Sequence, residues 1–334
     1  MKHKITFFAF LILALMCLYF LGSTPVRPKF DSAMPVVPQT PAALEKYVAL
    51  QEAQHKLKPD NEARIVWADS TKKKTEYSVV YLHGFSASQE EGNPVHRDFA
   101  KKFHCNLYLA RLADHGIDTV DQLLYFTPDR WWRSSQEALA IGKAIGEKVI
   151  VMSTSTGGTM ALMLAAEYPQ DVFALINMSP NIAINDPNAW LLNNPWGLSI
   201  ARLVIGGKER SFPKDSLKDR YWNNPYRLEA VVQLEELLED KMNEITFHRV
   251  KCPNLTLYYF KDEKEQDPVV KVGAMIEMNQ QLGTPDSLKQ MVAIPRAGGH
   301  VLGSKIVSKD IPAVEEAIEK FAKMKLKLKS SSLK

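Results

Sequence analysis

The chain has 334 residues and a mass of 37.7 kDa, with 46% apolar and 24% charged residues. These proportions are those of a globular protein and exclude a disordered, collagen-like or coiled-coil chain. Three cysteines cannot build a disulfide framework. The net charge of +4 is unevenly spread, because residues 1–30 carry +4, residues 320–334 carry +6 and the body between them carries −6. An acidic body argues against a broad nucleic-acid surface, so we expect no nucleic-acid partner.

Residues 1–22 form the first distinct segment. Two lysines precede an uncharged run over residues 5–21, which has the minimum length of a membrane-spanning helix. No Ala-x-Ala-like cleavage site follows this run. We therefore predict an N-terminal membrane anchor, with the folded body outside the cytoplasm because of the lysines at the start. A cleaved signal segment, which would give a secreted or periplasmic protein, and a lipoprotein attached at Cys17 are the alternatives.

The rest of the chain divides into a linker, a domain and a tail. Residues 23–41 contain five prolines and predict a semi-rigid extended linker. The folded domain is expected over 42–325, and a lysine-rich basic tail over 326–334.

Strand-like and helix-like runs alternate along the domain. The predicted strands are 63–68, 78–82, 106–109, 149–153, 174–178, 255–260 and 290–294, and the predicted helices are 42–57, 94–103, 134–146, 156–168, 268–282 and 310–325. Apolar strands that alternate with helices indicate a mostly parallel sheet with helices on both faces. The alternation stops over about 181–250, where one helix-like run and no convincing strand are present. We interpret this insert as a helical cap.

The segment KVIVMSTSTGGTM contains the sharpest local motif. A buried strand ends at Ser153 and passes through Ser155 and Gly157 directly into a helix of small residues. A serine nucleophile on such a turn needs small neighbours, because the backbone folds sharply beneath it, and the N–H groups at the helix start can stabilise an oxyanion. The motif is Gly-x-Ser-x-Gly with Ser153 in the first glycine position. Taken alone, the segment is also compatible with a Ser/Thr-rich helix cap.

Two loops after other strands carry further polar residues. His83-Gly84-Phe85-Ser86 follows the second strand and is suited to presenting the Phe85 N–H, with His83 ordering the loop by hydrogen bonds. Ala297-Gly298-Gly299-His300 follows the last strand, and an acidic loop over 262–267 follows the one before it. The chain order is serine, acid, histidine, each beyond the carboxyl end of a strand, where ligands gather in open α/β sheets.

At this point the chain resembles the α/β-hydrolase superfamily, in particular capped carboxylesterases and monoacylglycerol-lipase-like members. The resemblance covers residues from about 60 to 325. It implies that Ser155 is the nucleophile, that His300 is the general base and that an acid of the 262–267 loop orients this histidine. It further implies that the backbone N–H groups of Phe85 and Thr156 hold the oxyanion.

The identity of the acid stays open at the level of sequence. Asp267 resembles the superfamily's Asp-x-Val-Val pattern and precedes a predicted helix with Pro268 at its first position. It would also be explained as the N-cap of that helix. Asp262 competes because it is nearer the strand end, and Glu263 and Glu265 are the remaining candidates.

The resemblance implies an ester hydrolase that acts through a covalent acyl-enzyme without a metal or an organic cofactor. Its expected substrate is a small-molecule ester or a lipid-like molecule, and the membrane is its expected partner through the N-terminal segment. Another acyl or carbon–carbon bond hydrolase, an acyltransferase and a catalytically silent binding protein are the alternatives, because one fold hosts many chemistries.

Overall fold

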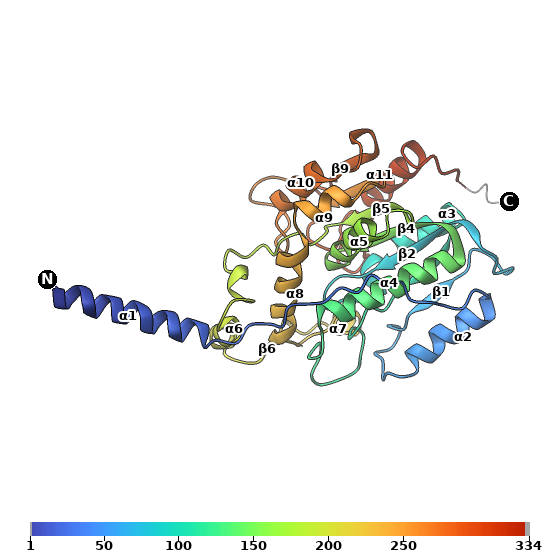
Figure 1. Cartoon of the computed structure of the whole chain (residues 1–334). Coiled ribbons are helices and arrows are strands. Elements are labelled where there is room, and N and C mark those ends of the chain that lie inside the picture. The colour runs from blue at the N-terminus through green and yellow to red at the C-terminus, as the bar shows by residue number, and fades with distance from the viewer. Residues whose placement is uncertain (1, 331–334) are drawn as a thin grey trace.

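The computed structural model describes residues 2–330 and contains one seven-stranded sheet (Figure 1). The strands run in the order β1-β3-β2-β4-β5-β8-β9. Their bounds are β1 Arg64–Val66, β2 Thr75–Leu82, β3 Asn106–Leu109, β4 Gly146–Thr154, β5 Val172–Met178, β8 Asn254–Tyr258 and β9 Lys289–Ala293. Only β1 is antiparallel to its neighbour, and the other pairs are parallel. The seven predicted strands and the mostly parallel sheet are thereby confirmed.

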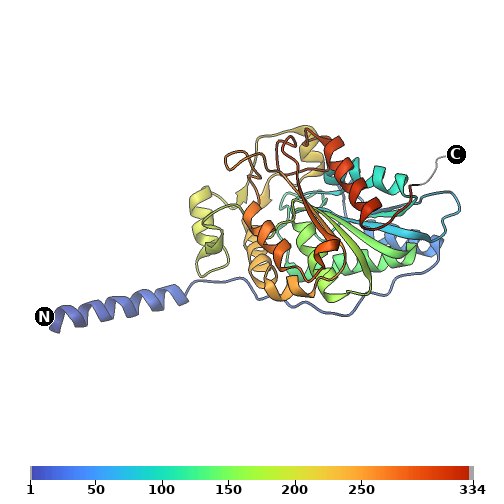
Figure 2. The same ribbon diagram turned by 90° about the horizontal axis from the view of Figure 1, so that it is seen from above.

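Both faces of this sheet are apolar. Val79 and Tyr81 of β2 pack in one hydrophobic core with helices α3 (Val95–Lys102) and α11 (Ile311–Met324). Val80 and Leu82 pack in a second core with helices α4 (Pro128–Ile145) and α5 (Thr156–Glu167). Because successive side chains of a strand point to opposite faces, a sheet covered on both sides needs unbroken apolar strands. Figure 2 shows α3 and α11 on one side of the sheet and α4 and α5 on the other.

The predicted helices outside the insert are present, with shifted ends. Their bounds are α2 Pro41–Glu52, α3 Val95–Lys102, α4 Pro128–Ile145, α5 Thr156–Glu167, α10 Val272–Gln281 and α11 Ile311–Met324. Helix α4 begins before the predicted residue 134. The backbone of Thr127 is extended, and Pro128 occupies the first helical position, where proline is favoured. Helix α10 begins at Val272 and not at Pro268, so Asp267 is not its N-cap.

The insert between β5 and β8 contains more than one kind of element. It comprises η2 Ala189–Leu191, α6 Gly197–Ile205, β6 Glu209–Arg210, α7 Ser216–Tyr221, β7 Tyr226–Arg227, α8 Leu228–Lys241 and α9 Glu244–Arg249. Strands β6 and β7 pair antiparallel and were not expected, because two residues are too short to show a period. Helices α8 and α9 pack against α5. The role of the insert as a cap stays a prediction.

Helix α1, Lys2–Phe20, projects from the body (Figure 1). Among the described residues 2–330, no helix is both long and apolar enough to cross a membrane. The uncharged part of α1, residues 5–20, spans about 24 Å at roughly 1.5 Å per residue, whereas a bilayer's hydrocarbon core is about 30 Å thick. The predicted membrane anchor, and the membrane-anchored location that depended on it, are therefore wrong, and nothing supports the membrane as a partner.

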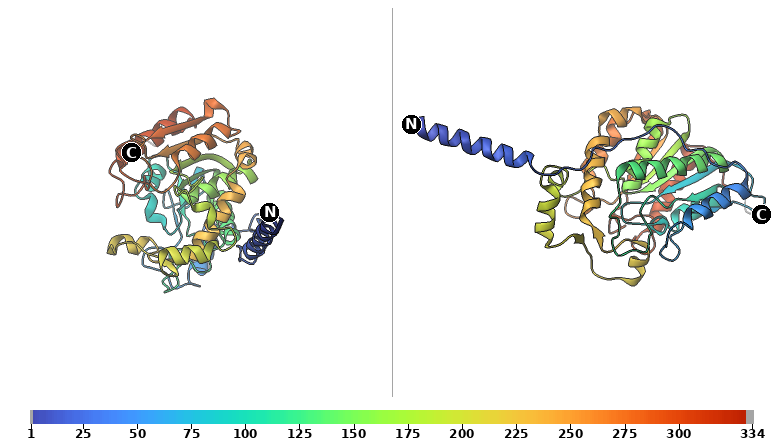
Figure 3. Two further views of the ribbon diagram at one scale, coloured as in Figure 1. Left: turned by 90° about the vertical axis from the view of Figure 1, so that its left-hand side faces the viewer. Right: turned by 60° about the horizontal axis from the view of Figure 1, so that its bottom comes forward.

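The segment that joins α1 to α2 runs along the body (Figure 3). The Asp31 carbonyl accepts hydrogen bonds from Trp132 Nε1 at 2.6 Å and Gln136 Nε2 at 2.7 Å, and Val37 is buried. At the other end of the chain, Leu326 and Leu328 are buried, whereas Lys327 and Lys329 are exposed. Residues 331–334 of the predicted basic tail lie outside the described residues. The boundaries of linker, domain and tail stay predictions.

Candidate active site

Ser155 occupies the sharp turn between β4 and α5. Its backbone has φ 53° and ψ −124°, a conformation that is uncommon for a residue with a side chain. The Ser155 N–H donates to the Met178 carbonyl at 3.0 Å, and its carbonyl accepts from the N–H groups of Gly158 at 2.8 Å and Asn181 at 2.9 Å. Backbone strain of this kind persists only where surrounding contacts enforce it, and it is concentrated at functional sites.

Small residues on both sides of Ser155 permit this turn. A Cβ atom on Gly157 would lie 2.1 Å from the Leu82 carbonyl oxygen, so only glycine lets α5 approach β2 this closely. Ser153 stands where the usual motif has glycine. Its hydroxyl is buried and donates to Asn177 Oδ1 at 2.7 Å, and Asn177 donates in turn to Asn254. The Ser153 side chain is thus buried and held by a side chain of the neighbouring strand β5.

Asp267 and His300 lie side by side. Asp267 Oδ2 is 2.7 Å from His300 Nδ1, and Oδ1 accepts from the N–H groups of Val269 at 2.9 Å and Val270 at 3.1 Å. The Asp267 side chain is fully buried, and that of His300 is 10% exposed. An aspartate in this position holds the proton of a histidine on Nδ1 and leaves Nε2 as the acceptor.

Burial and charge act in opposite directions on this pair. Burial raises the pKa of Asp267, but the His300 charge and hydrogen bond and the two backbone N–H groups outweigh burial, so the net pKa is lowered. Burial lowers the pKa of His300, but the charge and hydrogen bond of Asp267 and the charge of Glu91 outweigh it, so the net pKa is raised. The pair therefore favours an ionised aspartate beside a readily protonated imidazole.

The other acids of the loop point elsewhere. Asp262 is exposed, and its carboxylate accepts from the N–H groups of Lys264 and Glu265. Glu265 forms an ion pair with Lys261 at 2.9 Å, and Glu263 is exposed. Of the four acids considered from the sequence, the structure brings only Asp267 to His300.

His300 Nε2 is buried, and no group in the described part of the chain hydrogen-bonds it. The Ser155 hydroxyl therefore does not reach Nε2 in this conformation. The His300 loop and the elbow share a neighbour, Met178: a Cβ atom on Gly303 would lie 3.0 Å from Met178 Sδ, and the Met178 carbonyl accepts the Ser155 N–H. Catalytic hydrogen bonds are often long in an unliganded site and shorten when substrate binds.

The loop after β2 leaves the Phe85 N–H free, whereas the N–H groups next to it have acceptors. The Gly84 N–H donates to Glu91 Oε2 at 2.6 Å, the Ser86 N–H donates to His115 Nε2 at 3.0 Å, and the Ala87 N–H donates to the Gly84 carbonyl at 3.2 Å. No acceptor within residues 2–330 takes the Phe85 N–H. The Thr156 N–H lies at the first position of α5, where a helix leaves its N–H groups unpaired.

Two buried histidines hold this loop in their neutral forms. His83 Nε2 accepts from the Leu112 N–H at 3.0 Å, so its Nδ1–H donates to the Gly84 carbonyl at 2.9 Å. Burial lowers the pKa of His83 well below its ordinary value and that of His115 to about 3. Both ring nitrogens of His83 bind backbone groups, so neither is available to accept another proton. His300 Nε2, by contrast, has no partner among the described residues.

Glu91 is a residue of this site that the sequence did not reveal. It belongs to η1, Gln89–Gly92, and is 2% exposed. Its carboxylate binds the Gly84 N–H, and its charge acts on His300. No pattern marks it, because Gln89-Glu90-Glu91 reads as an exposed polar run and glutamates are rarely buried.

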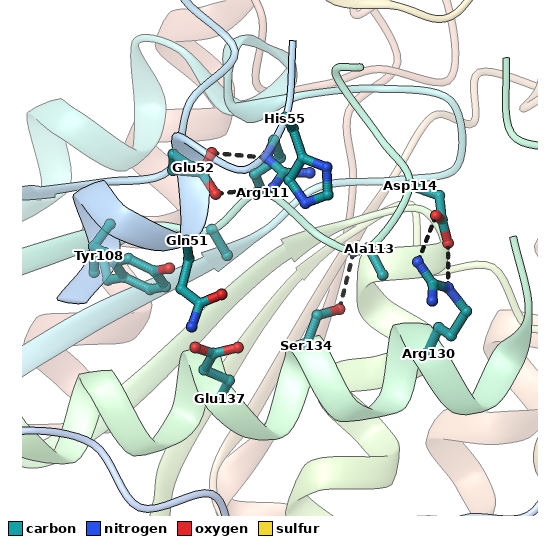
Figure 4. Close-up of a pocket in the computed structure, with 12 residues that line it drawn as sticks. Gln51, Glu52, His55, Tyr108, Arg111, Ala113, Asp114, Arg130, Ser134 and Glu137 are labelled. Atoms are coloured by element: carbon teal, nitrogen blue, oxygen red, sulfur yellow. Dashed lines mark hydrogen bonds and ion pairs between the residues drawn. The ribbon is translucent and has the colours of Figure 1, made fainter. Parts of the chain in front are cut away.

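A separate polar cavity of about 150 Å³ lies beside the carboxyl end of β3, between α2 and α4 (Figure 4). Its lining includes Glu52, His55, Arg111, Asp114, Arg130 and Glu137. Arg111 pairs with Glu52 at 2.7 Å and Arg130 with Asp114 at 2.8 Å, so its arginines are already neutralised. Ligand pockets usually measure about 300–1,000 Å³. The cavity is thus smaller than a usual ligand pocket, and it is distinct from the site around Ser155, because neither Ser155 nor His300 lines it.

Comparison with known proteins shows which fold this is. No protein-family model and no curated protein matches the sequence. Solved structures do match, and one is described with LipS and LipT, two metagenome-derived lipolytic enzymes (17% identity, 80% of this chain and 100% of that chain covered, TM-score 0.63). A second is a monoacylglycerol lipase from Paleococcus ferrophilus (14% identity, 79% of this chain and 99% of that chain covered, TM-score 0.55). A third is a soluble variant of monoglyceride lipase from Saccharomyces cerevisiae (13% identity, 80% of this chain and 90% of that chain covered, TM-score 0.56). The chain therefore has the α/β-hydrolase fold, as its sequence motifs predicted.

We expect Gly157→Ala to destabilise the protein by about 1–3 kcal/mol, because the added methyl group would meet backbone atoms at the end of β2. Gly273→Ala is the matched control, since Gly273 is likewise the second residue of a helix, but a Cβ atom there would have no neighbouring atom within 4 Å. That change should be neutral or stabilise by up to about 1 kcal/mol. Urea unfolding of the two variants measures the difference, and equal stabilities would contradict the packing argument.

Proposed function

We propose that this protein of α/β-hydrolase fold is a serine hydrolase that cleaves carboxylic esters through an acyl-enzyme. In this mechanism Ser155 is the nucleophile, His300 is the general base and Asp267 orients His300. The N–H groups of Phe85 and Thr156 hold the oxyanion of the tetrahedral intermediate.

The reaction proceeds in two halves. His300 Nε2 takes the hydroxyl proton of Ser155 while Oγ attacks the ester carbonyl carbon, and the imidazolium then gives this proton to the departing alcohol. A water molecule, deprotonated by His300, attacks the acyl carbonyl carbon; the bond to Ser155 Oγ breaks, the imidazolium returns its proton to Oγ, and the acid is released. Asp267 stays ionised throughout and stabilises the imidazolium at each stage.

The observation that carries this proposal is the state of His300. Its Nδ1 is bound to a fully buried carboxylate, while its Nε2 is buried and lacks a partner among the described residues. A buried nitrogen without a partner costs free energy in a purely structural role. A reacting hydroxyl at Nε2 would account for it.

The similar structures support a substrate class. Two of them are named for monoacylglycerol or monoglyceride lipase activity and one is described as lipolytic. We infer a small-molecule ester or lipid-like ester as substrate. A panel of p-nitrophenyl esters of increasing acyl length, compared with thioester and amide analogues, separates this activity from the other acyl-transfer chemistries of the fold.

The first prediction of this mechanism concerns the serine. Ser155→Ala should lower kcat for ester hydrolysis by about 10³-fold or more, because the hydroxyl that forms the acyl-enzyme is removed. A fluorophosphonate probe should label the native enzyme and not this variant. Ser153→Ala is the control, and it should keep both labelling and turnover because its hydroxyl is engaged inside the sheet. Labelling of Ser155→Ala at the native rate would refute the assignment.

A second prediction concerns the aspartate. In Asp267→Asn, the amide oxygen can keep the two backbone hydrogen bonds, so the stability should change little. The amide nitrogen would then face His300 Nδ1 and move its proton to Nε2, which should lower kcat by roughly 10²–10⁴-fold. Asp262→Asn should retain native kcat, because Asp262 binds only its own loop. A fast Asp267→Asn enzyme beside a slow Asp262→Asn enzyme would contradict the choice of acid.

A third prediction concerns pH. The base must be neutral to accept a proton, and the pKa of His300 is raised from its ordinary value. Activity should therefore be lost as the pH falls through a value above about 6.5, the ordinary pKa of histidine. In Asp267→Asn, the residual kcat/KM should extend to lower pH, since the carboxylate charge that raises the His300 pKa is gone. An acid limb that does not move in this variant would speak against the pairing.

A further inference from the structure

Glu91 is a buried carboxyl group between the loop after β2 and the His300 loop. Only 2% of it is exposed, and its Oε2 accepts the Gly84 N–H at 2.6 Å. A buried ionisable group is costly to retain unless its neighbours stabilise it. Three groups lower its pKa against the effect of burial: the Gly84 N–H, the His300 charge and the Trp222 side chain.

The position of Gly84 shows how near Glu91 is to the nucleophile. A Cβ atom on Gly84 would lie 2.8 Å from Ser155 Cβ and 3.0 Å from each carboxylate oxygen of Glu91. Both side chains therefore contact the same glycine. The segment after η1 also contacts the segment after His300, because Lys305 donates its N–H to the Asn93 carbonyl at 3.0 Å.

We propose that Glu91 is a positioning residue of the active site: its carboxyl group holds the Gly84 N–H so that the adjacent Phe85 N–H is presented to the substrate oxygen, and it places a buried acidic group beside the loop that carries His300. This inference rests on the proposed function, because it assigns Glu91 a role in that same reaction.

The first half of the role follows from the backbone of the loop. Its amides are held at Gly84 by Glu91 and at Ser86 by His115, on either side of Phe85. With both neighbours fixed, the peptide plane that carries the Phe85 N–H cannot rotate to find another acceptor. A donor fixed before the reaction stabilises the oxyanion without a reorganisation cost.

The second half of the role follows from charge. Burial raises the pKa of Glu91 to about 7, so its ionisation falls in the range where His300 works. The titratable groups that act on the two residues are Asp267 on His300 and the Tyr81 hydroxyl beside Glu91. Tyr81 stays neutral because burial and the Glu91 charge raise its pKa well above 10. An ionised Glu91 therefore adds to Asp267 in stabilising the imidazolium.

Two variants of the full-length protein separate the two halves. Glu91→Gln keeps a carbonyl oxygen for the Gly84 N–H but removes the charge, so the pKa of His300 should fall and the acid limb of kcat/KM should move to lower pH. Glu91→Ala removes the acceptor as well. It should lower kcat by about 10-fold or more with KM within about 3-fold, by analogy with the roughly 10²–10³-fold cost of losing an oxyanion donor outright.

Glu90 provides the matched control. It is the neighbouring buried glutamate of η1, but its carboxylate accepts from Asn93 Nδ2 at 2.9 Å and 3.0 Å and does not bind the loop. Glu90→Gln should retain the native acid limb. A structural effect common to buried glutamates of η1 would move both residues' variants alike.

The outcomes distinguish this inference from the proposed function. If the native enzyme neither hydrolyses esters nor reacts with a fluorophosphonate probe, the proposed function fails. If the native enzyme does both, the inference is overturned by a Glu91→Gln variant with the native acid limb, or by a folded Glu91→Ala variant with the native kcat. Circular dichroism and thermal unfolding establish folding, and where Glu91→Ala does not fold, the Glu91→Gln profile decides.

Discussion

The close approach of α5 to the end of β2 is the constraint on which the candidate site depends. Gly157 lies against the Leu82 carbonyl, and this contact holds Ser155 at positive φ above the sheet. The same contact brings the start of α5 beside the loop that begins at His83. This one backbone contact therefore brings the proposed nucleophile and both proposed oxyanion donors together, and larger side chains at the turn would separate them.

In the loop after β2, hydrogen bonds engage the backbone groups on both sides of Phe85. Two neutral histidines and a buried carboxyl group occupy the N–H and carbonyl groups around Phe85. Phe85 itself packs edge-to-face on Phe126 and Tyr226, with ring centroids 5.3 Å and 5.2 Å apart. Because its side chain is held by aromatic packing and its neighbours by hydrogen bonds, its N–H has a defined direction while no described residue accepts it.

The electrostatics around His300 follow from burial. A buried imidazole alone would be a poor proton acceptor, because desolvation disfavours its charged form. Asp267 reverses this effect through a direct hydrogen bond, and Glu91 adds to it from the opposite loop. Asp267 can remain ionised at this depth because two backbone N–H groups stabilise its other oxygen. The protonation of His300, on the segment after β9, is thus controlled by groups from the segments after β8 and β2.

Local sequence determined the elements of this protein and the residues that end its strands. Unbroken apolar runs predicted the seven strands, and the small residues around Ser155 predicted the elbow, because these features depend on neighbours in the chain. The strands β6 and β7 escaped prediction, since no period can be read in two residues. The start of α10 was predicted at residue 268, but the helix begins at Val272. The anchor was predicted from an uncharged run whose helical part proved too short. Which acid meets His300, and that Glu91 is buried beside Gly84, were decided only by the tertiary structure. Contacts between separate loops depend on how the sheet brings its strand ends together, and a local pattern does not contain that information.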